Sequence, residues 1–219
     1  AVAGLLVSEL EWKADKMRLG LAVSASVEFL RPTPPGALRS EPAILRKGRR
    51  TSVLTYRLYA GERQTAQATI CFVAPIAMPV SDSPARIPND PNALAPLPPK
   101  PAIHGTPWMM DNFAVRQADD GIIWFEYLDS IVDGMTPLAR VLGPADWTHG
   151  LGRPKSPKLA DPNVNLQVCL SRQPVGDHIG ILPKTMWMQK GHGLGEGTLF
   201  DTAGPFGRVM MAVALTQFG

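Results

Sequence analysis

The sequence predicts an α+β protein built from two copies of one unit, each a helix followed by an antiparallel meander. Three observations support this prediction, and the first is an internal repeat. Segments of the second half repeat segments of the first in the same order: 168–172 on 27–31 and 199–200 on 58–59, both 141 positions apart (168 − 27), and 209–216 on 65–72, 144 apart (209 − 65). A helix-type segment precedes each copy, and a proline-rich segment separates the copies. A period of this size is typical of duplicated domains.

The first copy begins with residues 1–13, which are apolar on every side for two turns and therefore indicate a buried helix. Residues 19–30 then alternate between apolar and polar positions, which is the period of a strand. The run from Arg31 to Gly36 contains three prolines and ends this strand. Three further strands are expected at 41–46, 52–59 and 66–73.

Residues 76–106 contain eight prolines and little periodicity. Proline at this density removes ladder hydrogen bonds and favours extended geometry, so we expect a linker on the surface. The predicted organisation is an N-terminal domain at 1–75, the linker at 76–106 and a C-terminal domain at 107–219. The second copy has about thirty residues ahead of its helix, and their counterparts in the first copy would precede Ala1, so we expect the natural start to lie upstream.

The second copy is expected to open with strands at 108–115 and 122–128. A helix should follow, with Thr136 as its N-cap and Pro137 at its first position. Gly143 and Pro144 should kink or interrupt this helix. The remaining strands are expected at 165–171, 179–188, 198–201 and 209–217.

The composition is that of a soluble globular protein, with 45% apolar and 19% charged residues. The net charge of +3 is spread along the chain and is too weak to indicate nucleic-acid binding. No apolar run reaches the length of about 18 residues that spans a bilayer. Cys71 and Cys169 lie in strand-like runs without metal-type spacing, which indicates two packed, reduced thiols in a cytoplasmic protein.

A duplicated helix-and-meander unit with VEFLRPTPPG at 27–36 and GHGLGEGTLFDTAGPFGRV at 191–209 resembles the double-hotdog acyl-CoA thioesterases of the thioesterase II-like family. The resemblance covers nearly the whole chain. It implies a tandem double hotdog, in which two antiparallel sheets each wrap a central helix. It also implies an enzyme of lipid metabolism that hydrolyses acyl-CoA to free acid and CoA without a cofactor. Long edge strands in such a fold favour a homo-oligomer.

The catalytic residues of that family are an Asp, a Ser or Thr, and a Gln in the second hotdog. Matched strand by strand, these positions fall on Asn165, Thr185 and Gln217, although a slip of one residue would exchange Thr185 for Met186. Asn165 departs from the family, because an amide orients a water molecule but does not accept its proton. If Asn165 has only that role, Asn165→Asp should raise hydrolysis. The residues alone equally allow Asn165 and Gln217 to be ordinary polar strand positions.

Two further segments are candidates for substrate binding. Arg49 and Arg50 lie in the densest basic run, which is either a solvated hairpin tip or a surface for the phosphates of coenzyme A. Gly193 lies in a glycine-rich run that leads into a strand and not a helix, so it does not fit a dinucleotide fingerprint. We expect that run to be a bulged start of a strand, close to the substrate.

Other polar and aromatic groups leave alternatives open. Asp146 and His149 lie three apart near the end of the second helix, where they form polar surface or, for Asp146, a substitute base. The four histidines show no metal-ligand spacing, so no metal is expected. Trp187 and its two neighbouring methionines either pack in the strand or line an acyl tunnel.

Two rival functions follow from the same resemblance. One is a hotdog that is catalytically weak or inactive and binds acyl-CoA or a protein partner, for which Asn165 is the best argument. The other is a hydratase or dehydratase, whose Asp and His pair with its hydration motif is not found in the sequence. Acyl-CoA is the expected small-molecule partner, and neither nucleic acid nor a membrane is expected.

Overall fold

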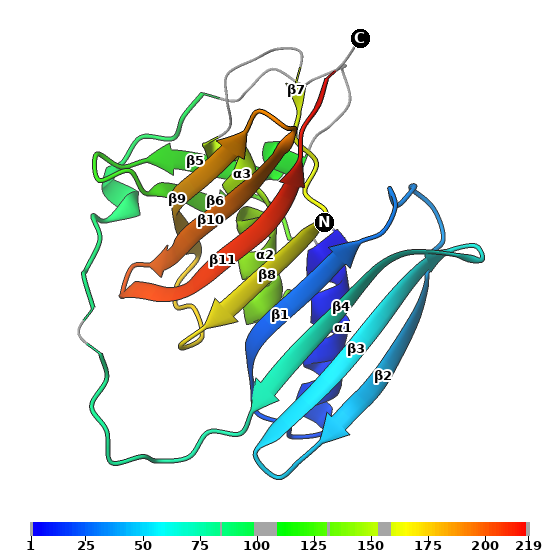
Figure 1. Ribbon diagram of the computed structural model, residues 1–219. Helices are drawn as coiled ribbons and strands as arrows, with labels where there is room; N and C mark the ends of the chain where they lie inside the picture. Colours follow the sequence, from blue (N-terminus) through cyan, green and yellow to red (C-terminus); the bar gives the residue numbers. More distant parts are fainter. Residues whose placement is uncertain (1, 84, 99–108, 131, 153–158, 218–219) are drawn as a thin grey trace.

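Ten antiparallel strands form one continuous sheet that curves around two helices (Figure 1). The computed structural model describes residues 2–83, 85–98, 109–130, 132–152 and 159–217. The strand order is β2-β3-β4-β1-β8-β11-β10-β9-β6-β5, and β12 pairs with β7 in a separate two-stranded ladder. The expectation of two separate sheets is wrong, because β1 of the first copy pairs antiparallel with β8 of the second.

The elements follow the predicted order closely. The helices are α1 (Val2–Lys16), α2 (Pro137–Asp146) and α3 (Thr148–Leu151). The strands of the first half are β1 (Leu21–Phe29), β2 (Arg39–Lys47), β3 (Thr51–Ala60) and β4 (Arg63–Val73). The strands of the second half are β5 (Phe113–Gln117), β6 (Ile123–Tyr127), β7 (Leu159–Ala160), β8 (Asn165–Leu170), β9 (His178–Met188), β10 (His192–Asp201), β11 (Gly204–Ala214) and β12 (Thr216–Gln217).

The core lies between the helices and one face of the sheet. Helix α1 packs against β3 and β4, α2 packs against β8 and β9, and the two helices pack on each other. Alternate residues of β8, at Leu166, Val168 and Leu170, are buried on this inner face. The intervening positions of β8 point to the outer face, as the period of a strand requires.

Helix α2 begins as predicted, with Thr136 at the N-cap position and Pro137 as its first residue, but it differs from the prediction in two respects. It continues through Pro144 to Asp146 without an interruption. Thr136 precedes its first residue, but the Thr136 hydroxyl makes no cap and donates instead to the carboxylate of Glu11 on α1. The Glu11 carboxylate also accepts the backbone N–H groups of Leu138 and Ala139, both at 3.4 Å. A side chain of the first half therefore caps the central helix of the second half.

Glu11→Ala should lower the free energy of unfolding by about 1–2 kcal/mol, because two helix N–H groups and one hydroxyl lose their acceptor. Burial raises the pKa of Glu11 above its ordinary 4.5, and the three hydrogen bonds only partly oppose this. A raised pKa in the folded state means that the contribution of Glu11 is fully present below the unfolded pKa and is lost as the pH rises. Glu11→Gln keeps an acceptor without the charge, so its stability relative to the parent should increase from pH 4.5 upward. Urea unfolding of both variants across that range measures this, and a pH-independent difference would contradict it.

The cysteines and the linker complete the comparison with the sequence. Cys169 is exposed and Cys71 half-buried, and both lie beside Ser24 of β1 on its two neighbouring strands. The prediction of two packed thiols is therefore wrong for Cys169.

The proline-rich linker is mostly exposed where it is described, and Figure 1 shows it running outside the sheet from β4 towards β5. No helix in the described part of the chain could span a lipid bilayer.

Candidate active site

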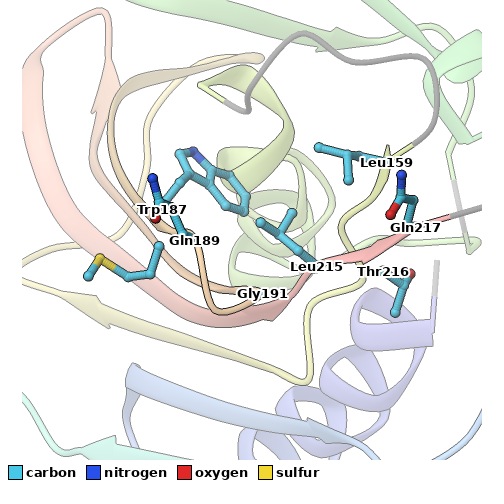
Figure 2. Close-up of a pocket in the computed structure, with 8 residues that line it drawn as sticks. Leu159, Trp187, Gln189, Gly191, Leu215, Thr216 and Gln217 are labelled. Atoms are coloured by element: carbon cyan, nitrogen blue, oxygen red, sulfur yellow. The ribbon is translucent and has the colours of Figure 1, made fainter.

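An open pocket of about 460 Å³ lies at the end of the sheet where β9, β10 and the C-terminal strand meet (Figure 2). Its lining residues are Leu159, Trp187, Met188, Gln189, Gly191, Leu215, Thr216 and Gln217. Figure 2 shows the Trp187 indole on one side of the pocket, with Leu159 and Gln217 on the other. The pocket thus combines apolar walls with amide groups, which is the usual composition of a small-molecule site.

Gln217, one of the three predicted catalytic residues, lines this pocket. It lies in β12 opposite Leu159 of β7, and its side chain is exposed. Strand β12 continues the line of β11 past the end of the main sheet and pairs there with β7. Gln217 is therefore available to a bound ligand.

Thr185, the predicted hydroxyl, lies on β9 opposite Gly195 of β10, on the same face as Trp187. Its hydroxyl donates to the carbonyl of Gly152 at 2.9 Å and accepts the Trp187 indole N–H at 3.1 Å. Thr185 does not line the pocket, because Trp187 stands between the two.

Asn165 does not line the pocket and bonds to the backbone of β11 instead. Its side-chain oxygen accepts the backbone N–H of Ala212 on β11 at 2.8 Å. The ladder between β8 and β11 shifts by one residue here, because Gln167 pairs with Met210 whereas Asn163 pairs with Val213. Such a shift is a bulge, and the Asn165 amide supplies the acceptor that the regular ladder would have provided.

Asn165 and Thr185 lie on opposite faces of the sheet. Asn165 keeps the outward alternation of β8, whereas Thr185 lies on the helix-facing side. The structure therefore separates Asn165 from Thr185 and Gln217. No described hydrogen bond joins Asn165 to either of them.

Asp161, which the sequence did not single out, carries a carboxylate on the inner face of the sheet. Leu159, Asp161 and Asn163 alternate along one extended segment and share a face. Leu159 lines the pocket, and Asn163 donates to Asp146 at the end of α2 at 2.7 Å. The side chain of Asp161, between them, is only 10% exposed and lies 3.6 Å from the imidazole of His149 (Oδ2 to Nε2).

The register brings Asp161 close to Gln217. Ala160 pairs with Thr216, and Asn163 pairs with Val213, so Asp161 stands opposite Leu215. Gln217 is then its diagonal neighbour on the adjacent strand, at a Cα separation of about 7–8 Å. Asp161 lies only four residues ahead of Asn165 in the sequence, which is the position matched to the family carboxylate. The bulge between the two residues is not visible in the sequence.

Helix α3 holds His149 over the sheet at Gly195. A Cβ atom on Gly195 would lie 3.1 Å from the Cβ of His149, and one on Gly197 would lie 3.2 Å from the side chain of Thr148. The glycine-rich run of β10 therefore allows α3 to approach the sheet. The expectation of a bulged start is wrong, because His192 to Leu199 pair with β9 and β11 in an unbroken register.

The remaining predicted residues lie outside the pocket. Arg49 and Arg50 are exposed in the turn between β2 and β3, five strands from β10 in the sheet order. Gly193 lies beneath the Trp187 ring, where an added Cβ would be 2.5 Å from Cε3. Asp146, the alternative base, is engaged by Asn163. Among the described residues, no cluster of three His, Cys, Asp or Glu side chains could hold a metal ion.

Comparison with known proteins identifies the fold. Residues 1–73 match the family model described as "Acyl-CoA thioesterase N-terminal domain". A comparison with curated sequences finds no match. The tesB protein of Mycobacterium avium subsp. paratuberculosis has a TM-score of 0.70 at 16% identity, over 97% of this chain and 86% of that one.

Two further solved structures are similar. An acyl-CoA thioesterase II from Mycobacterium marinum has a TM-score of 0.70 at 14% identity, over 91% of this chain and 82% of that one. A protein with the hot dog fold from Alicyclobacillus acidocaldarius has a TM-score of 0.67 at 15% identity, over 90% and 79%. At these identities the likeness shows the α+β hotdog fold, as the sequence predicted.

Proposed function

We propose that this protein hydrolyses acyl-CoA to free acid and CoA. The premise is that residues 1–73 match the acyl-CoA thioesterase N-terminal domain family and that the chain has the thioesterase II-like hotdog fold. The observation that supports this best is the register that places a carboxylate on the strand next to an amide that lines the pocket. Asp161 provides the carboxylate and Gln217 the amide. A carboxylate near an apolar pocket, together with an amide that lines it, suits the addition of water to a carbonyl group.

In this proposal Asp161 accepts a proton from a water molecule as the water oxygen bonds to the thioester carbon. The Gln217 amide orients that water or the carbonyl oxygen, which carries the developing negative charge. The carbon–sulfur bond then breaks, the electron pair leaves with sulfur, and CoA departs as its thiolate or thiol. General base assistance of this kind is worth about 10² to 10⁴ in rate.

Thr185 and Asn165 take secondary places in this arrangement. The Thr185 hydroxyl accepts the Trp187 indole N–H and does not line the pocket, so in this proposal it positions the indole and does not contact the reacting group. Asn165 completes the ladder between β8 and β11 and so fixes the segment that presents Asp161. In this proposal Asp161 takes the role of the family carboxylate, because Asn165 lies on the outer face of β8 and the bulge before it turns Asp161 to the inner face.

The contribution of Arg49 and Arg50 to coenzyme A binding stays a prediction. Their turn lies about 24 Å from β10 along the sheet, at five strand spacings of about 4.8 Å. A second copy of the protein, if self-association occurs, would have to bring such a turn to the pocket. Charge reversal of both residues, with the affinity for CoA as the readout, tests their role.

A hotdog that binds acyl-CoA without hydrolysing it is the second candidate. One observation favours it: the Asp161 side chain is only 10% exposed and lies beside His149, so water has little access to it in this conformation. The protein would bind acyl-CoA without hydrolysing it if water does not reach the Asp161 carboxylate in the complex.

The test is a panel of acyl-CoA thioesters, from acetyl-CoA to palmitoyl-CoA, assayed for thiol release. Non-hydrolysable thioether analogues measured by calorimetry separate binding from hydrolysis. Thiol release by the parent that falls by about 10² to 10⁴ in Asp161→Asn supports the thioesterase. Binding of the analogues without thiol release supports the second candidate, and the absence of both contradicts the proposed function.

A further inference from the structure

The Trp187 indole forms one side of the pocket. Its N–H donates to the Gly152 carbonyl at 3.0 Å and to the Thr185 hydroxyl at 3.1 Å, so one donor is shared between two acceptors. Figure 2 shows the ring turned towards the space that Leu215 and Gln217 border from the other side. Two acceptors on separate elements hold the ring in one orientation.

The sheet beneath the ring is built to receive it. Gly193 of β10 pairs with Trp187, and a Cβ atom there would lie 2.5 Å from Cε3 and 2.8 Å from Cζ3 of the indole. Any side chain at position 193 would therefore displace the ring from the sheet. Gly193 thus acts on the pocket through Trp187, which differs from the direct substrate contact predicted from the sequence.

The inner face beyond the ring is already occupied. Thr185 lies one inward-facing position further along β9, and its hydroxyl donates to Gly152. His149 stands over Gly195, the residue paired with Thr185. An apolar chain that enters from the pocket would meet the indole first and these polar groups next.

We propose that Trp187 is the end wall of the acyl site and restricts this protein to short acyl chains. The inference rests on the proposed function, since it assumes that the acyl group of a thioester occupies the pocket. The indole presents an apolar face to the chain end while its N–H is turned towards the two oxygens. A longer chain would have to displace a ring that two hydrogen bonds hold.

Replacement of the ring should lengthen the site without leaving a new unpaired group. In Trp187→Ala the Thr185 hydroxyl still donates to the Gly152 carbonyl, so both groups remain partnered. The space vacated by the indole is then available to additional methylene groups. Each methylene that becomes buried raises affinity about fourfold.

The experiment measures the affinity of thioether analogues of increasing acyl length for the parent, Trp187→Ala and Trp187→Phe. In the parent, affinity should stop rising beyond a short chain. In Trp187→Ala it should continue to rise about fourfold per methylene for several further carbons. Trp187→Phe retains a smaller ring without the N–H donor, and its limit should lie between the two. It also serves as the decisive variant if Trp187→Ala does not fold.

The matched control is Met186→Ala, on the neighbouring residue of β9, whose side chain is 52% exposed on the outer face. Its chain-length limit should equal that of the parent. An unchanged limit in a folded Trp187 variant, or an equal shift in Met186→Ala, overturns the inference while the proposed function stands. Failure of the parent to bind any analogue overturns the proposed function itself, so the two failures are distinguishable.

Discussion

Asp161→Asn should lower the rate of thioester hydrolysis by about 10² to 10⁴, the contribution of a general base. Asparagine has nearly the size and shape of aspartate, so its contacts with the surrounding inner face are largely kept. What it loses is the capacity to accept the proton of the attacking water. The measurement is kcat/KM for the best substrate of the parent, with urea unfolding to show that the variant is folded.

The companion variant Asn165→Asp separates this assignment from the one made from the sequence. Aspartate keeps an oxygen that accepts the Ala212 N–H, so hydrolysis and stability should both stay near those of the parent. Asn165→Ala removes the acceptor and should cost about 1 kcal/mol of stability without a specific loss of turnover. A rise in hydrolysis with Asn165→Asp, together with unchanged activity in Asp161→Asn, would return the catalytic carboxylate position to residue 165.

The difference between the proposed carboxylate, Asp161, and the position matched from the sequence, Asn165, has a local physical cause. Strand periodicity assigns faces correctly along 166–170, where the buried positions alternate as predicted. A bulge inserts one residue and exchanges the two faces on its far side. Sequence shows no mark of that insertion, because Val164 and Asn165 are compatible with either register. Gln217 lines the pocket because it lies on the continuation of β11, where β12 pairs with β7, and its catalytic role stays a prediction.

The elements themselves were more accessible to prediction than their long-range pairing. Apolar periodicity found α1 and the four strands of the first half, since each signal is local. The single sheet was not predicted, because the pairing of β1 with β8 joins residues more than 130 positions apart. The start of β10 was also missed. Its glycines have low strand propensity, and the approach of α3 to Gly195 and Gly197 accounts for them.

A buried carboxylate at the end of β10 supports the second prediction with a large effect. Asp201 is fully buried and accepts the Arg172 guanidinium through both oxygens, one of them at 2.7 Å from Nη2. It also accepts the backbone N–H groups of Val175 at 2.9 Å and Ala203 at 2.8 Å. The side chain thus joins the end of β8, the loop after it and the turn between β10 and β11.

Asp201→Ala should lower the free energy of unfolding by about 3 kcal/mol, because two backbone N–H groups and a guanidinium lose their acceptors together. The value lies at the low end for a broken buried pair, since the Arg172 side chain is 35% exposed and water can solvate it. Asp177→Ala is the matched control: its ion pair with Arg140 spans 3.4 Å, its side chain is 87% exposed, and the loss should stay within about 0.5 kcal/mol. Urea unfolding at neutral pH measures both. Equal losses in the two variants would mean that the Asp201 bonds contribute no more than a surface pair.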